Sequence, residues 1–342
     1  MDIQELHGIA ESIVADGKGI LAADESDSTI KKRFDSIGVE STEETRRAYR
    51  ELLFTTEGVE KFIGGVILFD ETIRQKTADG TPFPELLRSK GVVPGIKVDT
   101  GAKPLALTEG ETVTEGLDGL RERLAEYHGL GARFAKWRAT ITIGKDIPSE
   151  YCIWTNAHAL ARYAALCQEN GLVPIVEPEV LMDGDHSLER SFEVTSRTLH
   201  AVFTELRDQR IQPEGILLKP NMVLPGYDGS AQASDEEIAH ETVRCFAHHV
   251  PAAVPGIVFL SGGQSEEEAT RRLNAMNAIG PHPWKLSFSY GRALQAATLK
   301  AWGGHDENVD AAQRAYHHRA KMNSLAQLGT YSPELEQEAV PA

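Results

Sequence analysis

The sequence predicts a single α/β domain, a (β/α)8 or TIM barrel spanning residues 1–342. Three observations favour this fold: eight short apolar segments, longer helical patterns between most of them, and regular spacing of the segment ends. Strands that alternate with helices form parallel sheets, and eight such units close into a barrel. Lys136, Glu177, Lys219 and Ser261, at or near the ends of four consecutive segments, follow one another at steps of 41, 42 and 42 residues.

A doubly wound open sheet is the alternative fold. The chain length of 342 residues suits two domains as well as one large barrel. An open sheet that binds nucleotides would normally carry a G-x-G-x-x-G turn or a P-loop near its first strand. The sequence contains neither motif at that place, so the barrel is the preferred prediction.

Each predicted strand is a short apolar run bounded by turn residues. In chain order the runs are Gly19–Asp24, Gly64–Asp70, Val93–Val98, Ala132–Arg138, Val173–Glu177, Gly215–Lys219, Gly256–Ser261 and Trp284–Ser289.

Helix boundaries between the runs are marked by capping signals. Capping boxes, which satisfy free N–H groups of the first helical turn, are predicted at Ser41–Glu44, Ser234–Glu237 and Ser265–Glu268. Gly171 follows a long helical stretch as its expected C-terminal cap. Residues 1–16 are predicted as a helical extension outside the barrel, and residues 332–342, after Tyr331, as a C-terminal tail.

Charge and composition argue against two classes of partner. The net charge is −16, whereas nucleic acids and anionic membrane surfaces attract basic proteins. No apolar run approaches the ~20 residues of a membrane span, and the first ten residues do not resemble a signal peptide. The three cysteines, Cys152, Cys167 and Cys245, are sparse and lack C-x-x-C spacing. This pattern is typical of a reducing compartment, so we expect a cytoplasmic protein.

Charged residues stand where the predicted strands end. Active sites of barrels lie at the carboxyl ends of the strands. The residues at these ends are Asp24, Asp70, Lys97, Lys136, Arg138, Glu177, Glu179, Lys219, Ser261, Ser289 and Arg292. Such a set is unlike a hydrophobic core, and it collects scarce cations where an anionic metabolite could bind.

Lys219 is the most informative of these residues, because buried strands rarely end in an ammonium group. In general, burial and a nearby cation lower an amine's pKa and free its nitrogen to attack a carbonyl. Lys219 is therefore a candidate Schiff-base nucleophile, with Glu177 on the preceding strand as a proton shuttle. A structural ion pair between Lys219 and Glu177 explains the position equally well.

Two glycine-containing turns predict a phosphate site. Ser261-Gly262-Gly263 follows the seventh predicted strand and precedes a helix capped at Ser265, so its backbone N–H groups can face an anion. Gly291 and Arg292 follow the eighth strand and offer an N–H group and a guanidinium. Barrel phosphate sites commonly use these two loops, although the first turn alone is a weak signal.

Metal and serine-hydrolase chemistry find no support in the sequence. The 12 histidines lie away from the predicted strand ends, and no H-E-x-x-H or other metal-ligand spacing is present. Residues 183–186 (DGDH) lack the 12-residue ligand pattern of a calcium loop. There is no G-x-S-x-G motif. Asp24, after the first strand, fits either a catalytic acid or an ordinary turn residue.

A series of motifs resembles the class I fructose-bisphosphate aldolases. They run in order from about residue 6 to about residue 331: GILAADES, GGVILF, GIKVD, FAKWR, VPIVEPE, LLKPNM, FLSGGQSEEEA and FSYGRALQ. The resemblance implies a (β/α)8 barrel that cleaves fructose 1,6-bisphosphate reversibly to dihydroxyacetone phosphate and glyceraldehyde 3-phosphate. It implies a place in glycolysis and gluconeogenesis, no metal or other cofactor, and a homotetramer.

The resemblance also implies roles for individual residues. Lys219 would form the Schiff base, Glu177 would act as general acid and base, and Asp24 would assist at the C4 hydroxyl. Lys136 would support the charge balance and Arg138 would contact substrate. Lys97 and Glu179 would line the site. Ser261, Gly262, Gly291 and Arg292 would hold the C1 phosphate, and Ser26 and Arg33 the other phosphate.

Two departures from the family pattern stand out. The family often reads DESTGS after the first strand, whereas this chain reads DESDST and has Thr29 where a serine is usual. Well-studied animal members end in a tyrosine that helps protonate the enamine, whereas the last tyrosine here is Tyr331. A metal-dependent aldolase and a barrel that binds sugar phosphates without turnover are the competing functions.

Overall fold

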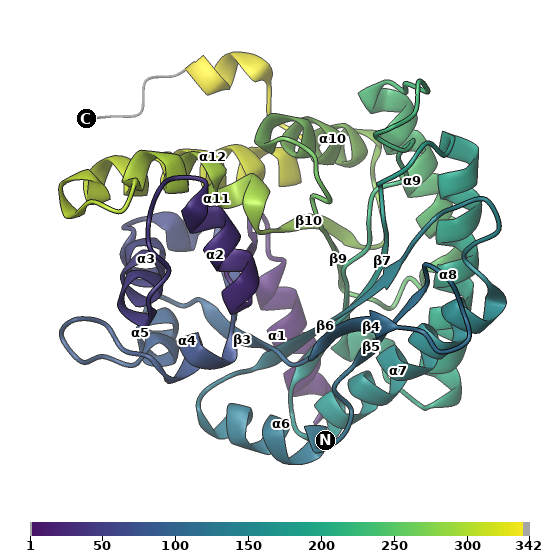
Figure 1. The fold of residues 1–342 in the computed structure, drawn as a ribbon, viewed down its shortest axis with the longest axis horizontal. Helices are drawn as coiled ribbons and strands as arrows, with labels where there is room; N and C mark the ends of the chain where they lie inside the picture. Colours follow the sequence, from purple (N-terminus) through teal and green to yellow (C-terminus); the bar gives the residue numbers. More distant parts are fainter. Residues whose placement is uncertain (1, 338–342) are drawn as a thin grey trace.

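The computed structural model describes residues 2–337 and contains a closed barrel of eight parallel strands surrounded by helices (Figure 1). The barrel strands are β1 (Gly19–Ala22), β2 (Ile63–Leu68), β3 (Val93–Lys97), β6 (Phe134–Ile141), β7 (Val173–Val180), β8 (Leu217–Leu218), β9 (Gly256–Phe259) and β10 (Lys285–Tyr290). They neighbour one another in chain order, and β10 pairs with β1. The predicted single-domain barrel is confirmed, and the doubly wound open sheet is wrong because the sheet closes.

Most of the helices connect successive strands and cover the outside of the barrel, whereas α1 precedes the first strand and α11 and α12 follow the last. Their bounds are α1 (Ile3–Ile13), α2 (Asp27–Asp35), α3 (Glu43–Thr55), α4 (Asp70–Arg74), α5 (Phe83–Ser89), α6 (Leu120–Gly129), α7 (Glu150–Glu169), α8 (Leu188–Asp208), α9 (Asp235–His249), α10 (Glu266–Ile279), α11 (Arg292–Trp302) and α12 (Val309–Gln327). A hairpin of β4 (Gly101–Pro104) and β5 (Thr112–Glu115), which the sequence did not predict, follows β3. No helix in the described part of the chain is long and apolar enough to span a membrane.

Strand lengths differ from the predicted runs in a way that matters for the site. β6 and β7 continue to Ile141 and Val180, because each pairs with the other along eight residues. Arg138 and Glu179 therefore lie within paired strands. β8 is only two residues long, but the Lys219 amide still donates to Val176 O at 2.8 Å. Pro220 follows and has no N–H to continue the ladder.

Two of the three predicted capping boxes are confirmed, at Ser234 before α9 and at Ser265 before α10. The Ser41–Glu44 box is wrong by one residue. Thr42 caps α3, and its hydroxyl accepts from the Thr45 amide at 3.1 Å. Thr45 completes the box, because its hydroxyl accepts from the Thr42 amide at 2.9 Å. The C-terminal cap of α7 is as predicted, with Gly171 at φ 72°.

The core consists of two main layers. The larger lies between the barrel and the surrounding helices, and the smaller fills the barrel interior. α1, within the predicted extension of residues 1–16, belongs to the interior layer. It supplies Leu6, Ala10 and Ile13 to the amino end of the barrel, and Val14 follows directly after it. The backbone comes so close that a Cβ on Gly64, at the start of β2, would lie 2.2 Å from Ile13 O.

The remaining segments bear on other predictions. Cys152, Cys167 and Cys245 are buried and not disulfide-bonded. Residues Pro333–Gln337 form a 3-10 turn, and the rest of the predicted tail, 338–342, lies outside the described residues.

Candidate active site

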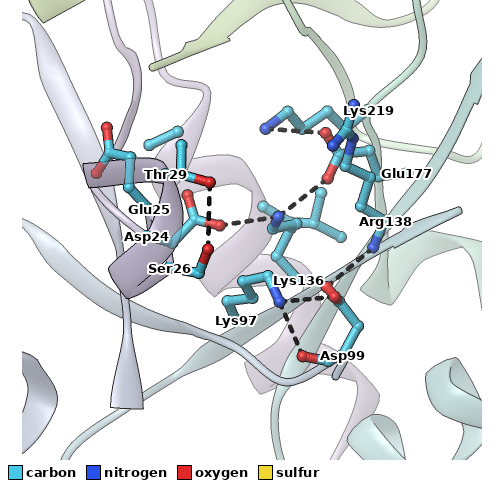
Figure 2. Close-up of polar contacts among 12 residues, drawn as sticks. Asp24, Glu25, Ser26, Thr29, Lys97, Asp99, Lys136, Arg138, Glu177 and Lys219 are labelled. Carbon is cyan, nitrogen blue, oxygen red and sulfur yellow. Dashed lines mark hydrogen bonds and ion pairs between the residues drawn. The ribbon is translucent and has the colours of Figure 1, made fainter. Parts of the chain in front are cut away.

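A cavity of about 1170 Å³ opens at the carboxyl end of the barrel strands. Its lining includes every residue that the sequence assigned to catalysis or substrate binding: Asp24, Ser26, Arg33, Lys97, Lys136, Arg138, Glu177, Glu179, Lys219, Ser261, Gly262, Gly291 and Arg292. These residues come from all parts of the chain, and Figure 2 shows the polar contacts on the side of Asp24, Lys97, Lys136, Arg138, Glu177 and Lys219. Eight of the 35 lysine and arginine residues of this acidic protein line the cavity.

Four buried charged side chains form a chain of ion pairs across the cavity floor (Figure 2). Lys219 Nζ lies 3.2 Å from Glu177 Oε1. Lys136 Nζ lies 3.4 Å from Glu177 Oε2 and 2.8 Å from Asp24 Oδ2. The order follows from the barrel, because β7 lies between β6 and β8 and places Glu177 between the two lysines. None of the four residues is more than 9 % exposed, so water screens these charges poorly.

The pKa shifts of Asp24 and Lys136 within these ion pairs follow from burial and from neighbouring charges. Burial alone would raise the pKa of Asp24, but the charges of Lys136 and Lys219 outweigh it and lower the pKa to about 2. Burial would lower the pKa of Lys136, but the carboxylates of Asp24, Glu177 and Asp99 raise it above its usual value. Asp24 is therefore a carboxylate and Lys136 an ammonium group throughout the physiological pH range.

Glu177 keeps capacity to accept a further hydrogen bond. Its Oε2 is buried and accepts no hydrogen bond from any residue in the range 2–337, although Lys136 Nζ is nearby. A buried carboxylate oxygen without a hydrogen bond is costly. At the floor of an open cavity, such an oxygen is placed to receive a proton from a bound molecule or to donate one to it.

A second group of charges lies on the β3 and β6 side of the cavity. Lys97 Nζ donates to Asp99 Oδ1 at 2.6 Å and to Asp99 O at 2.8 Å. Arg138 Nε donates to Glu179 Oε2. Burial raises the pKa of Glu179, and the positive charge of Arg138 opposes this only in part. Two cations thus face the cavity with one carboxylate partner each.

The two glycine-containing turns lie together, as the barrel order requires. Gly262 and Gly263 have φ values of 50° and 99°, which residues with a Cβ rarely adopt. Ser261 is buried, and its carbonyl accepts from the Gln264 amide at 3.0 Å, which closes the turn. Across β10, Gly291 immediately precedes α11, whose first residue is Arg292. A Cβ on Gly263 would lie 3.8 Å from the Arg292 guanidinium, so the glycine turn and this cation meet at one corner of the cavity.

Arg33 lies closer to this corner than the sequence suggested. A Cβ on Gly291 would lie 3.5 Å from the Arg33 guanidinium, which also donates to Glu25. Ser26 directly precedes α2, and its hydroxyl lies 3.2 Å from that of Thr29 in the first turn of the helix. Thr29 thus keeps a hydroxyl at the cavity wall.

Further polar residues line the cavity without an assigned role, among them Asp99, Glu25 and Ser289. Asp99 pairs with Lys97, and its position two residues beyond Lys97 was the available sequence signal. Glu25 accepts from Arg33, from Arg50 at 2.6 Å and from Gln295 at 3.0 Å. No local pattern reveals such a network, since its members are distant in sequence. The third residue, Ser289, is buried, and its hydroxyl makes no hydrogen bond within residues 2–337.

The candidate site offers no metal-ligand cluster. No group of three or more histidine, cysteine, aspartate or glutamate residues in the described chain could hold a metal ion. Tyr331 is also remote from the chemistry. Its amide donates to Asn274 and its hydroxyl to Glu336, and it is not among the residues that line the cavity.

Comparisons with known proteins agree on one family. The family model of class I fructose-bisphosphate aldolases matches residues 5–341. A probable class 1 fructose-bisphosphate aldolase of Xanthomonas campestris is 59% identical over 332 residues, which cover 97% of this chain and 99% of that protein. The cytosolic fructose-bisphosphate aldolase 4 of Arabidopsis thaliana is 58% identical, over 97% of this chain and 85% of its own length. A crystal structure of fructose-bisphosphate aldolase from Plasmodium falciparum, in complex with TRAP and a small-molecule inhibitor, superposes with a TM-score of 0.95. It is 52% identical and covers 96% of each chain.

Proposed function

Because this chain belongs to the class I fructose-bisphosphate aldolases, we propose which of its residues carry out the reaction of that family. The enzyme is a metal-independent lyase of glycolysis. It cleaves fructose 1,6-bisphosphate reversibly to dihydroxyacetone phosphate and glyceraldehyde 3-phosphate through a lysine Schiff base. Membership of class I rules out the alternative of a metal-dependent aldolase.

Lys219 is the Schiff-base lysine in this proposal, and its contact with Glu177 is the observation that carries it. Glu177, 3.2 Å from Lys219 Nζ, first takes a proton from the Lys219 ammonium group, and the freed amine attacks the C2 carbonyl of the substrate to form a carbinolamine. Glu177 then gives that proton to the carbinolamine hydroxyl, which leaves as water. The resulting iminium withdraws electrons from the C3–C4 bond.

Asp24 is the proposed base for carbon–carbon cleavage. It takes the proton of the C4 hydroxyl while the electrons of the C3–C4 bond move into the iminium, which becomes an enamine. The depressed pKa of Asp24 keeps it ionised before the reaction starts. Lys136 is the proposed cation that balances the charges of Asp24 and Glu177, since it lies within ion-pair distance of both.

The phosphate groups supply binding energy remote from the reacting bond. We assign the C1 phosphate to the corner of Ser261, Gly262, Gly291 and Arg292, and add Arg33 because it lies beside Gly291. Ser26, with Thr29 next to it, is assigned to the other phosphate.

The second charged group is assigned to the sugar chain between the phosphates. Lys97 and Arg138 are proposed to contact substrate, and Glu179 to hold Arg138 in place. The ion pair of Arg138 and Glu179 supports the last assignment.

The proposal extends to the state of the protein in the cell. We expect a cytoplasmic enzyme, since the Arabidopsis relative is described as cytosolic and the three cysteines are not paired. A homotetramer is expected from the family resemblance alone, and light scattering after gel filtration tests it. Residues 1–16 are proposed as an N-terminal helical extension of the single domain, and residues 332–342 as its C-terminal tail.

Borohydride trapping tests the central assignment. The protein is incubated with dihydroxyacetone phosphate, reduced and digested, and the peptide masses are measured. An adduct on the Lys219 peptide, formed equally well with EDTA, supports the proposal, and an adduct on another lysine contradicts it. A protein that binds the sugar phosphate but shows neither adduct nor cleavage would be a binding protein instead.

A further inference from the structure

The glycine pair of the Ser261–Gly263 turn is packed from outside by two side chains of neighbouring loops. A Cβ on Gly262 would lie 2.3 Å from Met182 Cε, and a Cβ on Gly263 would lie 3.1 Å from Tyr227 Cε2. Met182 belongs to the loop after β7 and Tyr227 to the loop after β8. The two side chains therefore occupy the space beside the backbone that ordinary residues would fill with their own Cβ atoms.

Tyr227 is itself fixed to the loop after β7. Its amide donates to Met182 O at 3.1 Å, and its hydroxyl donates to Met182 Sδ at 3.5 Å. On either side of it, the Gly226 amide donates to His186 O at 2.8 Å and the Asp228 amide to Gly184 O at 2.9 Å. The ring is thus held at its root by three backbone hydrogen bonds before it reaches the glycine turn.

We propose that Tyr227 is a positioning residue that holds the Ser261–Gly263 turn in the conformation that binds the C1 phosphate. This inference rests on the proposed function, in which that turn is the phosphate site. Glycine loses more conformational freedom on ordering than any other residue. A turn with two adjacent glycines that were free in solution would have to be ordered at each binding event, which weakens binding. Contact with the Tyr227 ring orders the turn in advance.

Tyr227 acts through the turn and does not contact the ligand. It is not among the residues that line the cavity, whereas Gly262, Gly263 and Met182 are. Its side chain is 46% exposed, so truncation would leave no large buried void. A change at Tyr227 should therefore alter phosphate binding far more than it alters folding or the chemical step.

The test compares Tyr227→Ala with Tyr227→Phe and with a matched control, Tyr151→Ala. Tyr151 is 51% exposed at the start of α7 and lies outside the cavity lining. In Tyr227→Ala, we expect KM for fructose 1,6-bisphosphate and the inhibition constant of inorganic phosphate to rise by the same factor. That factor is about fivefold to thirtyfold, which corresponds to reordering one glycine, while kcat stays within about twofold. Tyr227→Phe keeps the ring and should stay within about twofold of wild type, as should Tyr151→Ala.

Several outcomes overturn the inference. One is Tyr227→Ala with an unchanged inhibition constant for phosphate; another is Tyr227→Phe as impaired as Tyr227→Ala, since the ring is then irrelevant. A fall in kcat and Tm without a change in KM would indicate a merely structural role. Calorimetric titration of phosphate into wild type and Tyr227→Ala gives the same comparison without turnover. Failure of the proposed function shows separately, as a wild-type protein that forms no borohydride-trapped adduct.

Discussion

The amino and carboxyl ends of the barrel interior use the same strands and opposite chemistry. At the amino end, inward-facing residues are apolar and pack on α1. One inward position further along three adjacent strands, each apolar residue is followed by a charged one: Phe134 by Lys136, Ile175 by Glu177, and Leu217 by Lys219. Because side chains alternate in a strand, these steps of two residues stay on the inner face.

Residues that stabilise the fold and residues of the candidate active site thus lie only two positions apart on the same strands. The lower layer, at the amino end of the barrel, buries hydrocarbon, which stabilises the fold by roughly 25 cal/mol per Å². The upper layer, at the carboxyl end, buries four charges that pair with one another, which is at best a weak source of stability. A change in one layer should therefore affect stability and leave the chemical step unchanged, and a change in the other should do the reverse.

Lys219→Met should give the largest effect and should be confined to chemistry. We expect kcat to fall by more than about 10³-fold, because a nucleophile that forms the covalent intermediate has no substitute. Tm should stay close to that of wild type, since Glu177 keeps its ion pair with Lys136 when the Lys219 amine is removed, and the apolar side chain of methionine needs no hydration. Steady-state cleavage and thermal unfolding measure the two quantities. A Tm that fell together with kcat would show that Lys219 is mainly structural.

Leu6→Ala tests the other end. Leu6 is 1% exposed and packs with the interior residues of the barrel. Its truncation should lower the free energy of unfolding by about 2–5 kcal/mol, while kcat per folded molecule stays unchanged. Urea unfolding and active-site titration by borohydride trapping separate the two. If kcat fell while all molecules were still folded, the apolar layer and the charged layer would be coupled.

The sequence predicted the upper layer better than the lower one. The strand ends could be predicted because Lys219 and Glu177 stand out against apolar runs, and their convergence follows from barrel geometry alone. The packing of α1 into the amino end of the barrel (the α1 plug) could not be predicted, since an amphipathic N-terminal helix carries no signal for the surface on which it packs. Only the tertiary fold brings Ile13 against Gly64.

Within the site, the limit of prediction was again set by tertiary contacts. The family resemblance assigns Arg33 to the same phosphate as Ser26, and only the fold shows that its guanidinium also lies beside Gly291. Glu25 has three partners from distant parts of the chain, and no spacing rule connects them. The helix cap at Thr42 was misjudged for a local reason, since a threonine can replace glutamate as the third residue of the box.

Asp24→Asn should change how the free energy of unfolding depends on pH, by less than the change expected for Leu6→Ala. The neighbouring lysines hold the pKa of Asp24 at about 2 in the folded state, below its usual value of 3.8. Its ionised form thus contributes stability that is complete above the unfolded pKa and is lost as pH falls through about 2. The difference in free energy of unfolding between wild type and Asp24→Asn should therefore narrow by up to about 2 kcal/mol between pH 5 and pH 2. Urea unfolding at several pH values measures it, and a gap independent of pH would contradict the strong ion pairing of Asp24 with Lys136.

Gly8→Ala should give the smallest effect, and in the opposite direction. Gly8 lies on the exposed face of α1, and no atom lies within 4 Å of the position that its Cβ would take. Alanine in a helix interior is more stable than glycine by about 0.5–1 kcal/mol, because glycine loses more backbone entropy on folding. If α1 docks only as a formed helix, this gain should appear as a higher free energy of unfolding of the whole barrel, with kcat unchanged. The same variant leaves Tm unchanged if α1 detaches before the barrel unfolds, so the experiment also decides whether the plug and the barrel unfold as one unit.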